Sequence, residues 1–339
     1  MRIAYLSDRI SGNGFYRGTG PMTALEQLRG HDVRQLPLDE DRPPLAGVRD
    51  VDVLYVHRFC DERALKLVRE AKEHGAAVVW DNDDDMGASP KKSISYRAFG
   101  GVNWERRLQA MRRIFRLTDL VTAPSRVLAG RLAEAGAAHT AVVENHLPDQ
   151  FLDVERRPHD GVTIGWIAGL EHQVDAEQLP IRAVLQRLLD ERGDVNVVTI
   201  GLGLGLRSER YRHIDVAPLF ELTQEAAAFD VGIAPIADID LNRARSNVKL
   251  KEYAAGGGAW LASPIGPYAG MGEKQGGRLV PDDRWHEELA RLVDKPRERR
   301  KLAKRASKWV TGETLTAHVG DWEERFGEAL ERARAAAVA

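Results

Sequence analysis

The feature that most constrains this chain is an alternation of short apolar runs with longer amphipathic segments, and this alternation occurs twice. Short apolar runs between amphipathic helices are typical of strands in a parallel sheet that is covered on both faces. In the first half, the expected strands are Arg2–Leu6, Asp52–His57, Ala76–Trp80, Leu120–Ala123 and Thr140–Val143. The expected helices between them are Pro21–Arg29, Glu62–His74, Trp104–Leu117 and Ser125–Ala135. The pattern predicts a doubly wound α/β domain.

The alternation stops at a proline and a charged stretch, residues 148–160, and then begins again. The expected strands of the second half are Val162–Ile167, Val195–Ile200, Asp230–Ala234 and Ala259–Ala262. A length of 339 residues suits two domains of ordinary size. We therefore predict two facing Rossmann-like domains, residues 1–147 joined by a C-terminal helix, 315–339, and residues 148–314. A ligand is expected in a cleft between them, at the carboxyl ends of the strands.

Composition narrows the class of protein. No apolar run approaches the roughly 20 residues that a membrane span requires, and the N-terminus lacks the pattern of a secretory leader. The single cysteine, Cys60, cannot form an intrachain disulfide, and no Cys/His cluster has zinc-ligand spacing. We expect a cytoplasmic protein. A net charge of −2 argues against a protein that coats nucleic acid.

The most informative segment runs from a strand that ends at Pro235 to a helix expected to begin near Ser246. The N-terminus of a helix presents free N–H groups and favours an anion such as a diphosphate. Arg245 and Lys249 are four residues apart and share one helical face, and Glu252 follows on the same face. A carboxylate there can accept hydrogen bonds from ribose hydroxyls. On spacing alone, an ordinary charged surface helix is an equal alternative.

The pattern of Arg245, Ser246, Lys249, Glu252, Tyr253, Ala255 and Gly257 resembles a known motif. It is the donor-binding motif of GT-B fold glycosyltransferases of the retaining, glycogen-synthase-like (glycosyltransferase group 1) branch. Three further pieces resemble this family in the same order along the chain: the linker Asn145–Asp149, the segment Ile164–Gly169 with His172 and Asp175, and the strand and glycine-containing loop Trp260–Tyr268. One position departs from the family, because many members carry a glutamate where this chain has Ala244.

The resemblance implies a hexosyltransferase that uses a nucleoside diphosphate sugar, retains the anomeric configuration and needs neither a cofactor nor a metal for donor binding. A divalent metal remains an alternative. The residues expected in catalysis are Arg245, Lys249 and Asp84. Those expected to bind the donor are Gly14, Gly169, His172, Asn242, Ser246, Asn247 and Glu252. Those expected on the acceptor side are Tyr16, Arg17, His57, Asp81 and Asp83.

A glycine-rich segment, Ser11–Pro21, follows the first strand and contains G-x-G-x-x-x-G. We expect a loop over the cleft, with the helix starting at Pro21. The same glycines support a rival function, an NAD(P)-dependent oxidoreductase that binds the dinucleotide through Gly12–Gly18. A structural turn is a third interpretation, and a nonenzymatic sugar-nucleotide-binding protein is a further alternative to the transferase.

An acidic run, Asp81–Asp85, ends the strand Ala76–Trp80 and faces the expected cleft. Crowded carboxylates raise at least one pKa, so one of them can accept a proton from an acceptor hydroxyl. Binding of a divalent cation and helix capping are the alternatives.

The segment Lys91–Arg116 has eight Lys or Arg residues against one acid, Glu105. A solvated helix face is the simplest interpretation. A peripheral contact with an anionic membrane, or a polyanionic acceptor such as DNA, are the others. The residues do not identify the acceptor, which can be a small molecule, a glycan, a protein or a polyanion.

Overall fold

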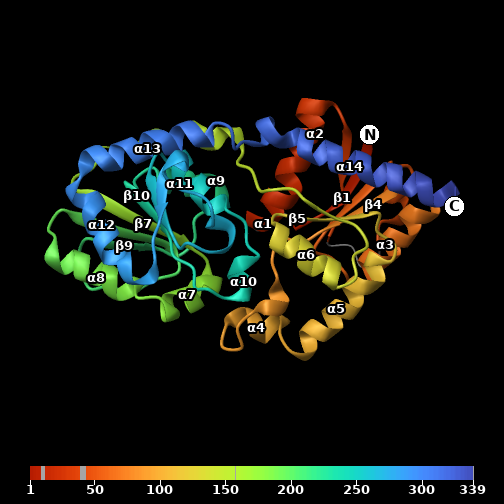
Figure 1. Cartoon of the computed structure of the whole chain (residues 1–339). Helices are drawn as coiled ribbons and strands as arrows, with labels where there is room; N and C mark the ends of the chain where they lie inside the picture. The colour runs from red at the N-terminus through yellow and green to blue at the C-terminus, as the bar shows by residue number, and fades with distance from the viewer. Residues whose placement is uncertain (9–11, 39–42, 157, 339) are drawn as a thin grey trace.

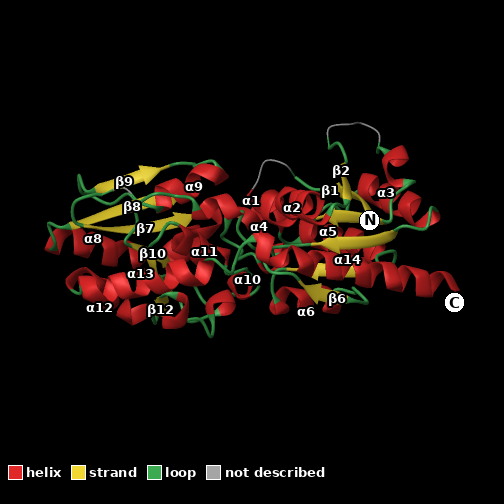
Figure 2. Cartoon of the chain, turned by 90° about the horizontal axis from the view of Figure 1, so that it is seen from above, coloured by secondary structure: helices red, strands yellow, loops and turns green. Residues whose placement is uncertain are grey.

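A computed structural model describes residues 1–8, 12–38, 43–156 and 158–338, and Ser11 of the glycine-rich segment lies outside this part. The chain forms two α/β domains that lie side by side (Figure 1). Each domain has one six-stranded sheet, and helices cover both of its faces (Figure 2). Among the described residues, no helix has the length and apolar character needed to cross a membrane.

The first sheet is entirely parallel, in the order β2-β1-β3-β4-β5-β6. Its strands are β1 (Arg2–Leu6), β2 (Asp32–Gln35), β3 (Val53–His57), β4 (Ala77–Asp81), β5 (Leu120–Ala123) and β6 (Thr140–Val142). One face packs on α3 (Glu62–Glu73), α5 (Val102–Phe115) and α6 (Arg126–Glu134). The other packs on α2 (Gly20–Arg29) and on α14 (Leu315–Val338), the last helix of the chain. A short helix, α4 (Ile94–Phe99), precedes α5.

The second sheet is also parallel, in the order β12-β11-β10-β7-β8-β9. Its strands are β7 (Val162–Ala168), β8 (Val195–Gly201), β9 (Tyr211–Ile214), β10 (Val231–Ala234), β11 (Ala259–Ala262) and β12 (Gly277–Leu279). Its helices are α7 (Gln173–Gln178), α8 (Ile181–Glu191), α9 (Leu219–Ala226), α10 (Asp240–Arg243), α11 (Val248–Ala255), α12 (Trp285–Asp294) and α13 (Pro296–Val310). This strand order is that of a doubly wound Rossmann-like sheet.

The sequence pattern identified nine of the twelve described strands, including the edge strand β6, but not β2, β9 and β12. β2 is an edge strand of the first sheet, and β9 and β12 are the two edge strands of the second sheet. β2 and β9 have no fully buried residue, and β12 is only three residues long. Edge strands of this kind carry no apolar run, because their side chains pack against little of the core.

The glycine-rich segment is helical rather than a loop, which corrects the prediction made from the sequence. A short turn, α1 (Gly12–Gly14), continues through a π-helical turn, Phe15–Thr19, directly into α2. A Cβ on Gly14 would lie 2.1 Å from the Asp8 carbonyl oxygen, and one on Gly18 would lie 2.2 Å from Ser7 Oγ. These two glycines therefore allow the helix to pack closely on the end of β1.

The chain crosses between the domains twice, and the two crossings run side by side. The first follows β6, and the second leads from α13 into α14, which lies along the first domain (Figure 1). Leu147 N donates to Glu313 O at 3.0 Å, and Leu315 N donates to Leu147 O at 2.7 Å. These backbone hydrogen bonds hold the crossings together like two strands of a short ladder.

A buried ammonium ties helix α11 to both crossings. The side chain of Lys251 is fully buried. Its Nζ lies 2.6 Å from Glu313 Oε2 on the second crossing and 2.9 Å from Asn145 O on the first. A buried charge is stable only where such partners replace water. Lys251 therefore fixes one face of α11 relative to the first domain.

We predict that Lys251→Met lowers the free energy of unfolding by about 3 kcal/mol, because Glu313 loses its cation while it remains partly buried. Urea denaturation followed by circular dichroism measures this change. Lys301→Met, at an exposed position of α13, is the matched control and should change stability by less than about 0.5 kcal/mol. Equal stability of the two variants would contradict the role given to Lys251.

Candidate functional site

The candidate site of the second domain lies where the strand order of its sheet reverses. β7 and β10 are neighbours there, and the chain leaves them toward opposite sides of the sheet. The loop after β7 carries Gly169 and His172, and the segment after β10 leads through α10 to Arg245 and then to α11. Ligands of open α/β sheets bind at such switch points, at the carboxyl ends of the strands.

Arg245 lies between these two loops. Its Nη1 is 3.4 Å from His172 Nε2 and 3.6 Å from Glu171 Oε1. Burial lowers the pKa of Arg245, but the carboxylates of Asp84, Glu171 and Asp175 more than offset this and leave the pKa raised. Its Nε is buried and has no hydrogen-bond partner among the described residues. A buried donor without a partner is costly, and it is a position where a ligand acceptor would be stabilised.

A buried hydrogen-bond network orients the groups around Arg245. Asp175 Oδ2 is 2.6 Å from His172 Nδ1, and its Oδ1 accepts from Asn242 Nδ2 at 2.7 Å. Burial, together with the charge of Arg245, lowers the pKa of His172 and favours the neutral ring. In the neutral tautomer that donates from Nδ1 to Asp175, Nε2 is an acceptor 3.4 Å from Arg245 Nη1. Asn242 also donates to Ala237 O at 2.9 Å. The amide expected to bind the donor is thus occupied in holding the loop.

Helix α11 carries the other two charged groups of the motif. Lys249 Nζ lies 3.4 Å from Glu252 Oε2, and Tyr16 OH of the first domain donates to Glu252 Oε1 at 2.8 Å. Glu252 is 3% exposed, and its Oε2 has no hydrogen bond within the described part of the chain. Tyr16, expected on the acceptor side, therefore contacts the second domain and fixes the orientation of this carboxylate.

The loop before α11 is held by the first domain. Ser125 Oγ donates to Ala244 O at 2.6 Å, and Asn145 Nδ2 donates to Ser246 Oγ at 3.1 Å. Ala244 is fully buried in the core of the first domain. The position where many members of the resembled family carry a glutamate is here a packing contact between the domains.

Asn247 and Gly169 lie at the ends of the two loops. Asn247 is the residue before α11, and its side chain makes no capping hydrogen bond. The free N–H groups of the first turn of α11 are thus not covered by this side chain. Gly169 precedes a short 3-10 turn, Leu170–His172. A Cβ on Gly169 would lie 2.2 Å from Glu171 Oε2.

Asp81, at the end of β4, and Arg17, in the turn Phe15–Thr19, pair with each other inside the first domain. Both side chains are fully buried, and Arg17 Nη2 lies 2.5 Å from Asp81 Oδ2. Arg17 also donates to Asn145 Oδ1, and Thr122 Oγ1 donates to Asp81. This placement does not fit the expectation that Asp81 and Arg17 touch an acceptor. Together they form an internal ion pair beneath the strand ends.

The remaining aspartates of the acidic run pair with two arginines. Arg58 pairs with Asp83 and, at 2.8 Å, with Asp84, whereas Arg131 pairs with Asp85. His57 is buried between Ser7 Oγ at 3.0 Å and Asp83 Oδ1 at 3.4 Å. Because the four carboxylates are divided among Arg17, Arg58 and Arg131, the run does not converge on one point as cation ligands would.

Asp83 and Asp84 are neighbours with opposite pKa shifts. Burial raises the pKa of Asp83. The charge of Arg58 and the hydrogen bond and charge of His57 outweigh burial, so the pKa lies below its ordinary value. For Asp84, burial and the charge of Asp83 raise the pKa above its ordinary value, although Arg245 and Arg58 oppose this. Asp84 therefore responds to charges on both domains. Two titratable groups with pKa values pushed apart are typical of a site that moves protons.

Two site residues were not found from the sequence. Glu171 lies beside Arg245 and His172, and Tyr268 is buried in the loop after β11, where the charge of Arg245 acts on its hydroxyl. Tyr268 ends the segment Trp260–Tyr268 that resembles the family, but the resemblance gave it no role, and Glu171 falls at no motif position. The signal for Glu171 in the sequence was its position directly before His172, a residue already expected to bind the donor.

Comparison with known proteins supports the fold. No protein-family model matches the chain, and no curated protein matches it. Three solved structures illustrate the similarity. HepE from Anabaena in complex with UDP has a TM-score of 0.65 at 15% identity, over 96% of this chain and 100% of that one. Sucrose-phosphate synthase from Thermosynechococcus elongatus has a TM-score of 0.70 at 13% identity, over 97% and 98%. A Listeria monocytogenes protein described as a UDP-N-acetylglucosamine 2-epimerase has 0.59 at 13% identity, over 98% and 97%.

These similarities span both domains and confirm the predicted GT-B fold. The same fold occurs in proteins with different named activities, so the reaction has to be argued from the residues of the site.

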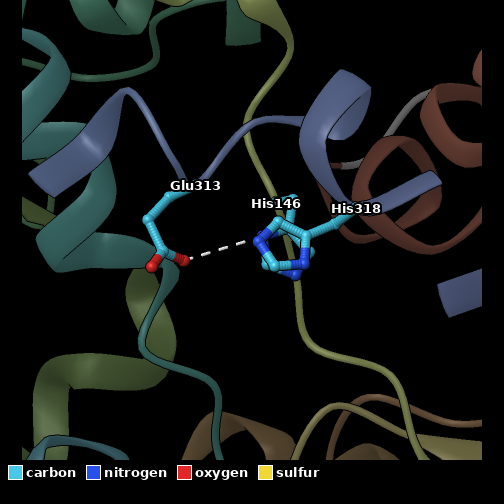
Figure 3. A group of neighbouring side chains, drawn as sticks. All are labelled: His146, Glu313 and His318. Atoms are coloured by element: carbon cyan, nitrogen blue, oxygen red, sulfur yellow. Dashed lines mark ion pairs between the residues drawn. The ribbon is translucent and has the colours of Figure 1, made fainter. Parts of the chain in front are cut away.

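A second cluster of chemically versatile side chains lies at the two crossings (Figure 3). His146, Glu313 and His318 offer ligand atoms within 4.8 Å of one another. The two imidazole rings are stacked, with centroids 3.7 Å apart and planes 8° apart. Ligand lone pairs lie in the ring planes, so those of stacked rings do not converge on one ion. The ammonium of Lys251 already neutralises Glu313 at 2.6 Å. The arrangement fits a packed junction better than a metal site.

His146 makes this junction sensitive to pH. Burial, together with the charges of Lys251 and His318, lowers its pKa to about 2. The unfolded chain binds a proton on this histidine below pH 6.5 while the folded chain does not, so its stabilising contribution is complete above pH 6.5 and falls as the pH decreases toward 2.

We predict that protonation of His146 in the unfolded chain lowers the free energy of unfolding by about 2 kcal/mol between pH 6.5 and pH 5. Urea denaturation at both pH values measures the loss, which should be smaller in His146→Gln. His139→Gln, at an exposed position, is the control and should keep the full loss. An unchanged pH dependence in His146→Gln would show that the histidine is not the cause.

Proposed function

We propose that this protein is a glycosyltransferase that moves a hexosyl group from a nucleoside diphosphate sugar to an acceptor hydroxyl. The observation that carries the proposal concerns two of the four buried side-chain atoms that form no hydrogen bond within the described residues, Arg245 Nε and Glu252 Oε2. Both belong to the segment that contains α11, and Lys249 Nζ lies 3.4 Å from Glu252 Oε2. Arg245 Nε belongs to a cationic donor and Glu252 Oε2 to an anionic acceptor. A nucleoside diphosphate offers both complements, because its phosphates accept and its ribose hydroxyls donate.

The named roles follow from the chemistry of these groups. Arg245, Lys249 and the N-terminus of α11 stabilise the diphosphate, and Glu252 accepts hydrogen bonds from the ribose. UDP and UDP-glucose are present in structures of HepE, which shares the fold. This supports a nucleotide-sugar donor for the present chain.

The proposed transfer needs no protein nucleophile. The bond between the anomeric carbon and the phosphate oxygen breaks, and a bond from the same carbon to the acceptor oxygen forms on the same face. The acceptor proton moves to the leaving diphosphate, and the proposal assigns Asp84 to the acceptor side, as expected from the sequence. Retention and independence of metal are parts of this proposal that rest on the family resemblance. A cytoplasmic location is likewise an expectation from the sequence.

Thermal-shift measurements with UDP-, GDP-, ADP- and dTDP-sugars test donor binding and identify the base, because a ligand that binds the folded state raises its melting temperature. Release of the nucleoside diphosphate with transfer to an acceptor then separates a transferase from a protein that only binds. Binding of NADH in place of every nucleotide sugar would instead favour the oxidoreductase.

We predict that Glu252→Gln weakens donor binding about 10- to 100-fold, because it removes charge from hydrogen bonds to the ribose. Lys249→Ala should lower kcat about 100-fold or more, because it removes a cation that stabilises the negative charge on the leaving diphosphate. Isothermal titration and steady-state kinetics measure the two effects. Glu177→Gln and Lys301→Ala, both at exposed positions, are the controls. Wild-type binding and kinetics in both site variants would remove this assignment.

A further inference from the structure

The first domain has a pocket at its own switch point that the donor does not occupy in the proposed function. β1 and β3 are neighbours at the place where the strand order of the first sheet reverses. A pocket of about 590 Å³ opens there, lined by the loops after β1, β3 and β4 and by one face of α4 and α5. This volume lies within the range of small-molecule sites, and the position is where open α/β sheets bind ligands.

The pocket adjoins the acidic groups of the candidate site. His57, Arg58 and Asn82 form its inner wall. Arg58 is the only described non-glycine residue with a positive φ, 66°. A left-handed conformation is unfavourable for arginine and persists only where surrounding contacts enforce it. Here the conformation accompanies the ion pairs that place the Arg58 guanidinium on Asp83 and Asp84. The charge of Arg58 is therefore already neutralised.

The outer wall carries positive charge that is not neutralised in this way. Arg106 and Arg107 of α5 line the pocket, and neither forms an ion pair with a carboxylate among the described residues. Arg107 is half-buried and held in place, because its Nη2 donates to Arg58 O at 2.9 Å and its guanidinium lies 6.0 Å from the Phe99 ring centroid. The lining also includes Asp8 and Asp61, and Asp61 caps α3 and lies 3.3 Å from Arg63.

The same wall separates the pocket from the rest of the basic segment Lys91–Arg116. Arg112 Nε donates to Ala135 O, and Arg113 pairs with Glu62. Arg106 and Arg107 of α5 thus line the pocket, whereas Arg112 and Arg113 have partners outside it. Apolar side chains, Phe59, Met86 and Phe99, complete the pocket and suit the C–H face of a sugar ring or another compact ligand.

We propose that this pocket binds the acceptor, and that the acceptor is a small hydroxyl-bearing molecule with a phosphate or carboxylate group held by Arg106 and Arg107. The inference rests on the proposed function and adds the chemical class of the second substrate. The anion binds at the outer wall, and the hydroxyl points toward the inner wall and the donor.

The single cysteine provides a direct measure of occupancy. Cys60 is partly exposed and lines the pocket. Burial raises the pKa of its thiol, so alkylation by neutral iodoacetamide is measured at pH 8.5, with and without each probe. The probes are matched pairs that differ in charge: glucose 6-phosphate, glucuronate and glucose, and glycerol 3-phosphate and glycerol. The phosphate and carboxylate arms distinguish the two sources of the anion.

The expected result is that at least one anionic probe slows alkylation of Cys60 fivefold or more at a concentration where its neutral counterpart does not. The double variant Arg106→Ala/Arg107→Ala should lose this protection. The matched double variant Arg112→Ala/Arg113→Ala, on the same helix outside the pocket, should keep it. Arg106→Glu, which leaves the contacts of Arg107 intact, should also abolish protection, so the result does not depend on the fold of the double variant.

Equal protection by neutral and anionic probes, no protection by any anionic probe, or protection that survives in both Arg106 variants would each overturn the inference. Thermal shifts with nucleotide sugars, recorded on the same samples, keep the two proposals apart. A nucleotide-sugar shift without anion-dependent protection removes only the acceptor class, whereas loss of the nucleotide-sugar shift in the wild type removes the proposed function.

Discussion

The buried ammonium of Lys251 is the interaction on which the relation between the two domains depends. It belongs to α11, the helix that carries Lys249 and Glu252, and it bonds to both of the segments that cross between the domains. One face of this helix is therefore fixed to the junction while another presents charges to the site. The arrangement couples stability to geometry, because the groups that would contact a donor cannot shift without disturbing a buried ion pair.

The candidate site is electrostatically shared by the two domains. Arg245 lies in the second domain, yet the carboxylate of Asp84 in the first domain raises its pKa, and Arg245 in turn opposes the rise in the pKa of Asp84. Tyr16 makes a similar link through Glu252. A site assembled in this way requires both domains in the observed arrangement.

The sequence indicated which side chains of α11 lie together, but not how the charged residues of the first domain are paired. Lys249 and Glu252 follow a helical spacing, and a helical spacing fixes which side chains share a face. Arg245, predicted to share that face, instead lies in the loop before α11, because the helix begins at Val248 rather than near Ser246. The acidic run had no such rule. Its four aspartates are separated by the strand end and by their partners, Arg17, Arg58 and Arg131, which are distant in the sequence. Spacing alone could not tell the internal ion pair of Asp81 from the more exposed Asp84.

The sequence by itself determined the alternation of strands and helices, the two-domain α/β class and the charged face of α11, because these depend on local periodicity. The tertiary structure decided the edge strands, the helical state of Gly12–Thr19 and the partners of each buried charge. A buried charge is stabilised by whichever groups the fold brings within hydrogen-bond distance, and no local pattern encodes those groups. For the same reason, the pocket beside Arg106 and Arg107 could not be seen before the strands were placed.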